Sequence, residues 1–471
     1  MSDVGHKLEK VLSSKFSQWF MKQMAKKGDE SAECYLDGLF EWYGGYCKGI
    51  PPLKYIIPYT AIEMIRKKAG FARDTVQREV FNFKPAQKGL VNTVRSLGDK
   101  GLMKPQVFQA PLMVVWNFTQ ACNFQCKHCY QDAHKKLSDE LTLEEQFKIV
   151  DELDELDVPL LAFAGGEPLM SKNFWAVAER AASYGIYVTV ATNGSLVTKD
   201  VAKRMVDIGV DYVEISVDSS SSGYHDNLRG HEGYWEQAVQ GLKNAVEAGG
   251  LKVGFAPTIT RNNYDQFDDM VKLARDIGVD VFYVFNFIPA GRAKDILDSD
   301  ITPEMRESLL QKVYKYMCED EIEMVSTSPQ LGRVCIQNFN NGDKEFINTG
   351  HYGKGLGMQA KVLAKYIGGC GAGRCYCAVQ PNGIVTPCVF LPITVGSLKN
   401  QTLKEIWDNT QIFDVLRDRS EENREGHCAV CDYKFYCGGC RARAYGYYGD
   451  VKAPDPGCIF NKSDWDKLNN K

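Results

Sequence analysis

Three cysteines that could bind a metal cluster lie within eight residues of one another, in the segment Cys122-Asn-Phe-Gln-Cys126-Lys-His-Cys129. Three thiolates on one loop can ligate three irons of a cubane iron–sulfur cluster, which proteins usually hold with four cysteines. The fourth iron is then open to a substrate or cofactor, as at catalytic metal sites generally. Half of a zinc site, completed by His128 or His134, is the alternative, but the ligand type and spacing favour the cluster.

A second concentration of cysteines lies near the C-terminus. Nine of the 16 cysteines fall between Cys370 and Cys458, and they include the pattern Cys428-X2-Cys431-X5-Cys437-X2-Cys440. In a long chain that shows no secretion signal, this clustering indicates metal or redox chemistry and not a disulfide scaffold. Structural zinc is again the alternative, because Cys-X2-Cys pairs also bind zinc.

Glycine-containing and polar motifs lie where apolar runs end. The segment Gly165-Gly166-Glu167-Pro168 lets the backbone approach a ligand closely, and Glu167 offers an anionic acceptor. Arg229 carries a charge that suits a carboxylate. The other members of this set are Thr192, Asn193, Ser216, Asp218 and Pro289. Each of them alone is also explained as a turn, a helix cap or a surface ion pair, so the prediction rests on the set.

Regular alternation of strands and helices is predicted to position these residues. Apolar, β-branched runs occupy residues 112–118, 160–166, 187–193, 212–218, 252–259 and 281–287. Helical spacing occupies 141–157, 174–185, 198–209, 234–249 and 265–278. Such a pattern predicts an α/β fold with a parallel sheet covered by helices, and six units form a partial (β/α)6 TIM-like barrel. Ligands bind at the carboxyl ends of the strands in these folds.

The remaining chain divides into three further regions. Residues 1–110 have helical spacing interrupted by turns, which predicts a helical N-terminal extension of the barrel at 111–300. A long helix and a Gly- and Asn-rich bridging segment follow at 301–369, and a small cysteine-rich domain occupies 370–471.

Composition excludes several classes of function. The chain has 471 residues and a formal net charge of −4, which gives it no general attraction to nucleic acid. No stretch approaches the roughly 20 apolar residues that span a bilayer. The N-terminal residues do not resemble a signal peptide, so we expect a cytoplasmic protein without a transmembrane segment.

Taken together, the three-cysteine loop and the barrel resemble the radical S-adenosylmethionine (SAM) superfamily. The resemblance implies that Cys122, Cys126 and Cys129 are the catalytic ligands of a [4Fe-4S] cluster whose open iron chelates SAM. Reductive cleavage of SAM then gives a 5′-deoxyadenosyl radical, which abstracts a hydrogen atom from the substrate. The resemblance also implies SAM contacts by His128, Gly165, Gly166, Glu167, Pro168, Thr192, Asn193, Ser216, Asp218, Arg229 and Pro289.

The later cysteines resemble the SPASM domain, a C-terminal extension that carries auxiliary iron–sulfur clusters. The pattern departs from the usual form at one place, since two residues and not three separate Cys437 from Cys440. The resemblance implies one [4Fe-4S] cluster on Cys428, Cys431, Cys437 and Cys458, and another on Cys370, Cys388 and Cys440.

Three alternatives remain for the fourth ligand of that second cluster: Cys377, Cys375, or no cysteine. Asn382-Gly383 lies between two apolar runs and predicts a hairpin turn, which would bring Cys377 and Cys388 together. Cys377 is therefore the preferred ligand.

The segment Cys437-Gly-Gly-Cys440-Arg-Ala-Arg-Ala-Tyr445 resembles the corresponding segment of a subgroup that contains haem-pathway, haem d1 and mycofactocin maturases. That resemblance implies an anaerobic radical SAM oxidoreductase acting on a tetrapyrrole carboxylate side chain. A ribosomal-peptide maturase is the alternative; an iron–sulfur electron-transfer protein would not need the Gly165–Pro168 motif. The expected partners are a ferredoxin or flavodoxin as electron donor and a small-molecule or peptide substrate.

Overall fold

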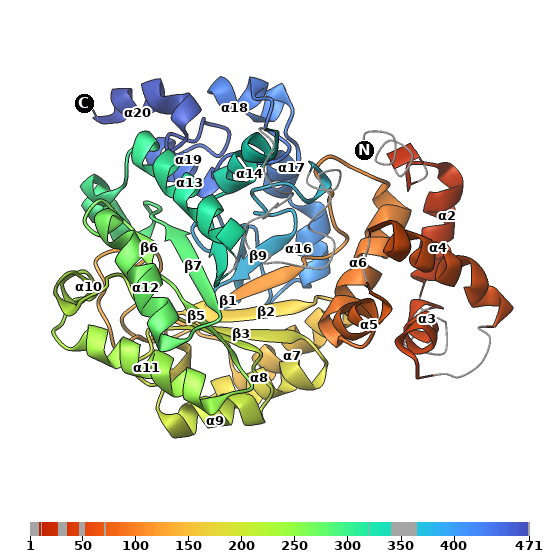
Figure 1. The fold of residues 1–471 in the computed structure, drawn as a ribbon, viewed down its shortest axis with the longest axis horizontal. Coiled ribbons are helices and arrows are strands. Elements are labelled where there is room, and N and C mark those ends of the chain that lie inside the picture. The colour runs from red at the N-terminus through yellow and green to blue at the C-terminus, as the bar shows by residue number, and fades with distance from the viewer. Residues whose placement is uncertain are drawn as a thin grey trace.

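The computed structural model describes residues 9–10, 12–26, 35–46, 52–69, 72–319, 321–340 and 365–469. A helical N-terminal region lies to the right of a central parallel sheet in Figure 1, and the C-terminal region lies mostly above the sheet in that view. No helix within the described part of the chain is long and apolar enough to cross a membrane.

Six parallel strands in sequential order form the centre of the molecule. They are β1 (Met113–Thr119), β2 (Leu160–Gly165), β3 (Tyr187–Thr192), β4 (Tyr212–Ile215), β5 (Lys252–Phe255) and β7 (Val281–Asn286). The register pairs Val114 with Leu161 and Thr192 with Ile215, which aligns the carboxyl ends of the strands. The predicted partial (β/α)6 barrel is therefore confirmed.

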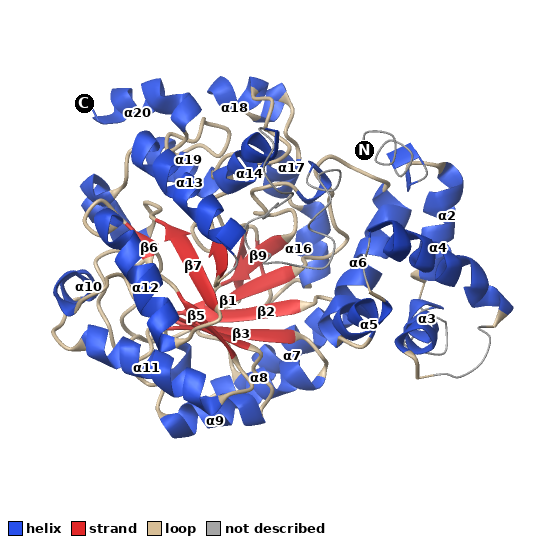
Figure 2. Ribbon diagram, viewed as in Figure 1, coloured by secondary structure: helices blue, strands red, loops and turns tan. Residues whose placement is uncertain are grey.

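Helices cover the outer face of this sheet (Figure 2). They are α7 (Leu143–Glu155), α8 (Phe174–Ser183), α9 (Lys199–Asp207), α10 (Ser222–Arg229), α11 (Tyr234–Ala248) and α12 (Phe267–Ile277). Thr142 and Glu145 form a capping box at the start of α7, which satisfies backbone N–H groups that the helix leaves free. Buried Val, Ile, Leu and Phe side chains of strands and helices share one core.

The strand predicted at residues 252–259 is divided into β5 and β6 (Thr258–Ile259). Pro257 lies between them, and a proline cannot donate a hydrogen bond to a neighbouring strand. The structure also places a seventh parallel strand, β8 (Glu323–Ser326), beside β7. The helices around it are α13 (Pro303–Glu319) and α14 (Gln330–Asn340). Helix α13, strand β8 and helix α14 of the predicted bridge thus extend the barrel, while residues 341–364 lie outside the described chain.

The N-terminal region is helical, as predicted. It contains α2 (Lys15–Met24), α3 (Tyr35–Gly44), α4 (Leu53–Ala69), α5 (Arg73–Val76), the π-helix η1 (Gln77–Phe81) and α6 (Lys84–Lys100). Helix α6 packs on the barrel, because Arg95 forms an ion pair with Asp157 at 2.8 Å and Gly89 lies against Pro159.

The C-terminal region continues the barrel sheet. Strand β9 (Tyr376–Val379) pairs in parallel with β1, and β10 (Ile384–Thr386) and β11 (Gly396–Ser397) follow antiparallel. The helices are α16 (Leu403–Asn409), α17 (Gln411–Arg417), α18 (Gly426–Val430), α19 (Arg441–Tyr448) and α20 (Lys462–Asn469). Short 3-10 turns are η2 (Pro168–Met170), η3 (Tyr264–Gln266), η4 (Gly291–Ser299), η5 (Glu421–Asn423) and η6 (Ile459–Asn461). The shared sheet brings the cysteine-rich region against the first strand.

Candidate functional site

The cysteine loop begins directly after β1. Burial, together with the nearby thiols of Cys126 and Cys129, raises the pKa of the Cys122 thiol to about 12. Backbone N–H groups of Phe124 and Ala133 donate to the sulfurs of Cys122 and Cys129, each at 3.4 Å. Neighbouring thiols in a buried site ionise only beside a strong positive charge, and a metal centre supplies one. The loop therefore has the chemistry of a cluster site.

The loop after β2 supports the cysteine loop. The backbone N–H of Gly166 donates to the carbonyl of Thr119 at 2.8 Å, and that of Glu167 donates to Ala121 at 2.8 Å. A Cβ atom on Gly166 would overlap the carbonyl oxygen of Ala121, and Gly165 has a positive φ of 116°. Glycine is needed here because two backbone segments touch.

The loop after β7 holds the cysteine loop from the other side. Arg292 donates its backbone N–H to the carbonyl of Cys129 at 2.9 Å and its Nε to the carbonyl of Cys126 at 2.8 Å. The cysteines are thus fixed by the ends of three strands.

A cavity of about 1710 Å³ opens from the cysteine loop into the barrel. Cys122, Cys126 and Cys129 all line it, and the lining continues along the inner faces of the strands to Tyr187, Lys252 and Glu323 at their amino ends. Residues of α5, η1 and α6 line that far end. The three thiols and the barrel interior therefore share one space.

Seven of the expected SAM-binding residues line this cavity: His128, Gly165, Gly166, Thr192, Asn193, Ser216 and Arg229. Four others, Glu167, Pro168, Asp218 and Pro289, are absent from the lining. Pro289 packs instead against Gly446 of α19. The structure thus brings seven of the eleven predicted residues together at the cavity and leaves the other four outside its lining.

Glu167 lies behind the cavity wall and organises it. Its Oε1 accepts from the Thr192 hydroxyl at 2.8 Å and from the Leu169 N–H at 3.2 Å, and its Oε2 accepts from the Asn193 N–H at 2.9 Å. Burial raises the pKa of Glu167 to about 7, although these hydrogen bonds oppose the increase. The direct SAM contact expected for Glu167 stays a prediction, and the carboxylate is bonded to the wall that SAM would meet.

Asp218 lies outside the cavity lining and supports Arg229, as Glu167 supports Thr192 and Asn193. Arg229 Nε donates to Asp218 Oδ2 at 2.7 Å, and Arg229 Nη1 lies 3.9 Å from the sulfur of Cys126. Burial alone would raise the pKa of Asp218, but Arg229 and two histidines hold it at about 2. Asp218 is fully buried and thus fixes a guanidinium beside the cysteine loop instead of reaching the cavity.

His128 contributes a neutral ring to the cavity wall. Burial lowers the pKa of His128 to about 4, and its Nδ1 has no hydrogen-bond partner among the described residues. An unpartnered buried nitrogen in a cavity wall is available to a ligand.

The first C-terminal cysteine group surrounds Tyr376. The thiols of Cys388, Cys370 and Cys440 all lie close enough to raise the pKa of this phenol beyond the effect of burial. Burial likewise raises the pKa of Cys388 to about 12 and of Cys440 to about 11. These three cysteines are the expected ligand set.

The prediction that the hairpin brings Cys377 and Cys388 together is wrong. The hairpin of β9 and β10 forms as predicted, but Cys377 packs in the main core on the opposite face from Tyr376, near Arg417. Successive side chains of a strand point to opposite faces, and Tyr376 already faces the cysteines. Cys375 instead donates its S–H to the carbonyl of Gly371 at 3.7 Å, in the turn that follows Cys370.

The second C-terminal group contains Cys428, Cys431, Cys437 and Cys458. The thiol of Cys428 raises the pKa of each of the other three, after the larger effect of burial. Gly439 donates its N–H to the Cys437 sulfur at 3.3 Å. The four cysteines therefore lie together, as expected.

All three groups suit clusters better than single ions. Among the residues that the structure describes, no three His, Cys, Asp or Glu side chains converge on one metal position. A mononuclear zinc site needs such convergence, whereas a cubane gives each thiolate its own iron and separates the sulfurs.

Two aromatic residues that the sequence prediction missed connect the first group to the next. Tyr130 follows Cys129, and its ring lies 4.8 Å from that of Phe390. Phe390 donates its N–H to the Cys388 sulfur at 3.4 Å and lines the cavity with Tyr130 and Tyr376. Their positions next to cluster cysteines in the sequence were the available signal.

Glu214 was also missed, although it lies on a predicted strand. It lines the cavity on β4 and forms no ion pair with any described residue. Burial raises the pKa of Glu214 to about 8, and its charge adds to burial in raising the pKa of Tyr130, Tyr212 and Tyr283. Its charged side chain in an otherwise apolar strand was the sequence feature that could have identified it.

Comparisons with known proteins agree with this geometry. The radical SAM superfamily model matches residues 116–291, and the SPASM model of an iron-sulfur cluster-binding domain matches residues 370–432. The AdoMet-dependent heme synthase of Methanosarcina barkeri is 31% identical over 353 residues, which are 74% of this chain and 97% of that protein. The mycofactocin maturase MftC of Mycolicibacterium smegmatis is 28% identical and covers 74% of this chain and 83% of its own length.

Among solved structures, Streptococcus suis SuiB bound to the precursor peptide SuiA has a TM-score of 0.62 and 16% identity. The match covers 91% of this chain and 93% of that chain. At this identity the likeness shows a shared fold.

Proposed function

The chain belongs to the radical SAM superfamily, and on that premise we propose that it oxidises a substrate held inside its barrel. It is an enzyme that uses SAM, a SAM-binding [4Fe-4S] cluster and auxiliary clusters of a SPASM domain. The single observation that carries the proposal is the common cavity, because the three thiols of the cysteine loop open directly into the barrel interior.

In this proposal Cys122, Cys126 and Cys129 hold the first cluster, and SAM occupies the cavity between His128, Gly165–Gly166, Thr192–Asn193, Ser216 and Arg229. When bound, the cluster and SAM supply a 5′-deoxyadenosyl radical that takes a hydrogen atom from the substrate. The protein's own part is positioning. Glu167 fixes the wall at Thr192 and Asn193, and Asp218 holds the Arg229 cation where a carboxylate of SAM can bind.

The substrate then occupies the remaining space toward the amino ends of the strands. A cavity of about 1710 Å³ exceeds the ~300–1,000 Å³ of ordinary ligand pockets, so it has room for a second molecule beside SAM. Aromatic and apolar side chains form most of its wall, and helices α5 to α6 cover its far end. Such an enclosure keeps water away from a reactive species.

The auxiliary clusters are proposed to lie on Cys370, Cys388 and Cys440 and on Cys428, Cys431, Cys437 and Cys458. Cys375 replaces Cys377 as the candidate for a fourth ligand at the first of them, since it contacts the turn after Cys370. When bound, these clusters supply an acceptor for the electron that the substrate loses after hydrogen abstraction. Tyr130 and Phe390 fill the space between the cysteine loop and Cys388.

A tetrapyrrole carboxylate side chain is the first candidate for the group that reacts. The similarity to the heme synthase carries this choice, because it spans 97% of that protein. Oxidation of such a side chain removes a hydrogen atom and one electron and releases carbon dioxide.

A peptide is the second candidate, and the charges of the cavity favour it. The lining residues Arg229, Lys252 and Arg292 are paired with Asp218, Glu323 and Asp132. Glu214, in contrast, has no cationic partner among the described residues. With its cations already paired and Glu214 protonated below about pH 8, such a wall suits neutral groups better than carboxylates, and the mycofactocin maturase similarity points the same way.

The test is anaerobic incubation of the reconstituted protein with SAM and dithionite, together with either a carboxylated tetrapyrrole or a candidate precursor peptide. We expect mass spectrometry to show loss of carbon dioxide or of hydrogen from one substrate class only, and 5′-deoxyadenosine in equal amount. Formation of 5′-deoxyadenosine without any modified product from either class would contradict both substrate proposals.

In the cell, we propose a ferredoxin or flavodoxin as the electron donor, because the first cluster needs a one-electron reductant. We also propose a cytoplasmic location, since thiolate ligands persist in a reducing compartment.

A further inference from the structure

Arg441 lies between the two C-terminal cysteine groups. It directly follows Cys440 and is 1% exposed. Its Nη2 lies 3.8 Å from the sulfur of Cys428 in the other group. Burial would lower the pKa of Arg441, but Cys428, Asp455, Cys370 and Cys440 together raise it. One guanidinium is therefore close to sulfurs of both groups.

The protein binds Arg441 through backbone carbonyls. Nη1 donates to the carbonyls of Val451 at 2.9 Å and Ala453 at 2.8 Å, and Nε donates to that of Gly439 at 3.4 Å. No carboxylate of the described chain lies within ion-pair distance of it. A fully buried cation is costly without a compensating negative charge, and the groups close enough to supply it are Cys428, Asp455, Cys370 and Cys440.

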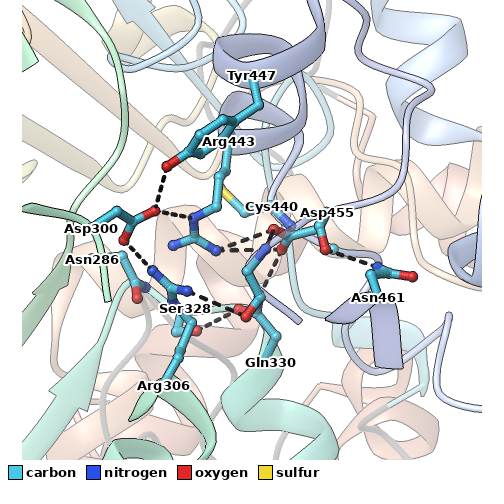
Figure 3. Close-up of polar contacts among 12 residues, drawn as sticks. Asn286, Asp300, Arg306, Ser328, Gln330, Cys440, Arg443, Tyr447, Asp455 and Asn461 are labelled. Atoms are coloured by element: carbon cyan, nitrogen blue, oxygen red, sulfur yellow. Dashed lines mark hydrogen bonds and ion pairs between the residues drawn. The ribbon is translucent and has the colours of Figure 1, made fainter. Parts of the chain in front are cut away.

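Three other buried arginines near Arg441 have carboxylate partners. Figure 3 shows Arg306 paired with Asp300 at 2.5 Å and Arg443 paired with Asp455 at 3.2 Å. Asp455 also accepts from the backbone N–H of Cys440 at 2.7 Å, so this network fixes the start of α19. Arg333 pairs with Glu307 and lies near Cys437 and Cys458 of the second group. Arg419 and Arg424 are also buried without an ion pair to any described residue and are also near cysteines of both groups. Arg441 differs from these two because one of its guanidinium nitrogens lies 3.8 Å from a cysteine sulfur.

We propose that Arg441 is a counter-cation shared by the two auxiliary clusters, and that it stabilises the reduced state of both. The inference rests on the ligand assignment of the proposed function. A cluster that accepts one electron from an external reductant gains one negative charge. A fixed cation in a poorly solvated site stabilises that charge and raises the reduction potential, since potentials depend on nearby charge and hydrogen bonding.

The test is an electron paramagnetic resonance redox titration of the anaerobically reconstituted full chain, with iron and sulfide measured on the same samples. In Arg441→Gln we expect both auxiliary clusters to become harder to reduce. The reduced-to-oxidised ratio at a fixed potential should fall about tenfold, which corresponds to 59 mV for one electron. Arg441→Lys retains the charge and should stay within about threefold of the wild type.

Arg333→Gln is the matched control, because Arg333 adjoins the second cysteine group alone. It should shift the potential of one auxiliary cluster and leave the other unchanged. If it shifts both clusters as Arg441→Gln does, the shared position of Arg441 has no special role and the proposal is overturned.

Iron content separates the remaining outcomes. Loss of auxiliary iron in Arg441→Gln but not in Arg441→Lys supports the need for a cation. Loss in both variants, or full iron with unchanged potentials in Arg441→Gln, overturns the proposal and leaves Arg441 a structural hydrogen-bond donor. Absence of auxiliary iron from the wild type would instead contradict the ligand assignment in the proposed function.

Discussion

Two glutamates of the barrel have different roles. Glu167 accepts three hydrogen bonds and fixes the backbone at Asn193, whereas Glu214 faces the cavity without a cationic partner among the described residues. Both were placed on strands or strand ends by the sequence, but only the packing shows that one supports the wall and the other forms part of it.

Replacing Glu167 by Gln should weaken SAM binding about tenfold. An amide retains one acceptor oxygen and turns an NH2 group toward a backbone or hydroxyl donor, which costs about 1–3 kcal/mol at a buried site, and about 1.4 kcal/mol equals a factor of ten. Titration of SAM into the reconstituted variant measures the effect, with iron content unchanged. Glu145→Gln, in the exposed cap of α7, is the control and should bind SAM normally. Equal affinities in both variants would remove Glu167 from the site.

The Glu214 carboxyl should make stability depend on pH. An unfolded glutamate loses its proton near pH 4.3, whereas burial raises the pKa of Glu214 to about 8 in the fold. The folded protein therefore binds the extra proton between these values, so this group's contribution to stability falls as the pH rises toward 8. Between pH 6.5 and pH 9, the free energy of unfolding of Glu214→Gln should therefore rise by about 2 kcal/mol relative to that of the wild type. Anaerobic urea unfolding at both pH values measures it, and a pH-independent difference would show that Glu214 ionises normally.

At the scale of elements, the site is built where three strand ends touch the cysteine loop. The loops after β2 and β7 hydrogen-bond the carbonyls of Thr119, Ala121 and Cys129, so the cysteines do not depend on their own loop for position. Close backbone contact explains the two glycines after β2.

Gly166→Ala should therefore disturb the first site selectively. The added Cβ would overlap the Ala121 carbonyl oxygen, and forced overlap costs about 1–3 kcal/mol, so SAM affinity should fall by about tenfold or more while auxiliary iron is retained. SAM titration and iron analysis measure the outcome. Gly223→Ala is the matched control, because an added Cβ there meets no atom within 4 Å. Similar SAM affinities for the two variants would contradict the loop contact.

The sequence predicted the main elements because each leaves a local pattern. Apolar runs of strand length marked the six central strands, and amphipathic spacing marked the helices between them. Strands β8 and β9 could not be placed in the sheet, because the pairing of each with β7 or β1 is a tertiary contact. The hairpin at Asn382–Gly383 was correct, but the face on which Cys377 lies depends on how β9 meets β1.

At the scale of the whole molecule, the sheet joins the two redox regions. Because β9 pairs with β1, the auxiliary-cluster region lies beside the strand that ends in the cysteine loop. Tyr130 and Phe390 then bridge the two regions at the cavity wall. Two concentrations of cysteines were predicted from spacing, and the division of the second into two ligand groups came from the resemblance to the SPASM domain. Supporting residues such as Arg292 come from distant segments and needed the fold.

The central claim is that the cysteine loop, and it alone, cleaves SAM. The most direct measurement is 5′-deoxyadenosine formed from SAM with dithionite by the anaerobically reconstituted wild type and by a triple variant, Cys122→Ala, Cys126→Ala and Cys129→Ala. Iron is measured on the same samples. The wild type should hold about twelve irons in three four-iron clusters and form 5′-deoxyadenosine. The triple variant should keep about eight irons and form none, whereas continued SAM cleavage by that variant would contradict the account.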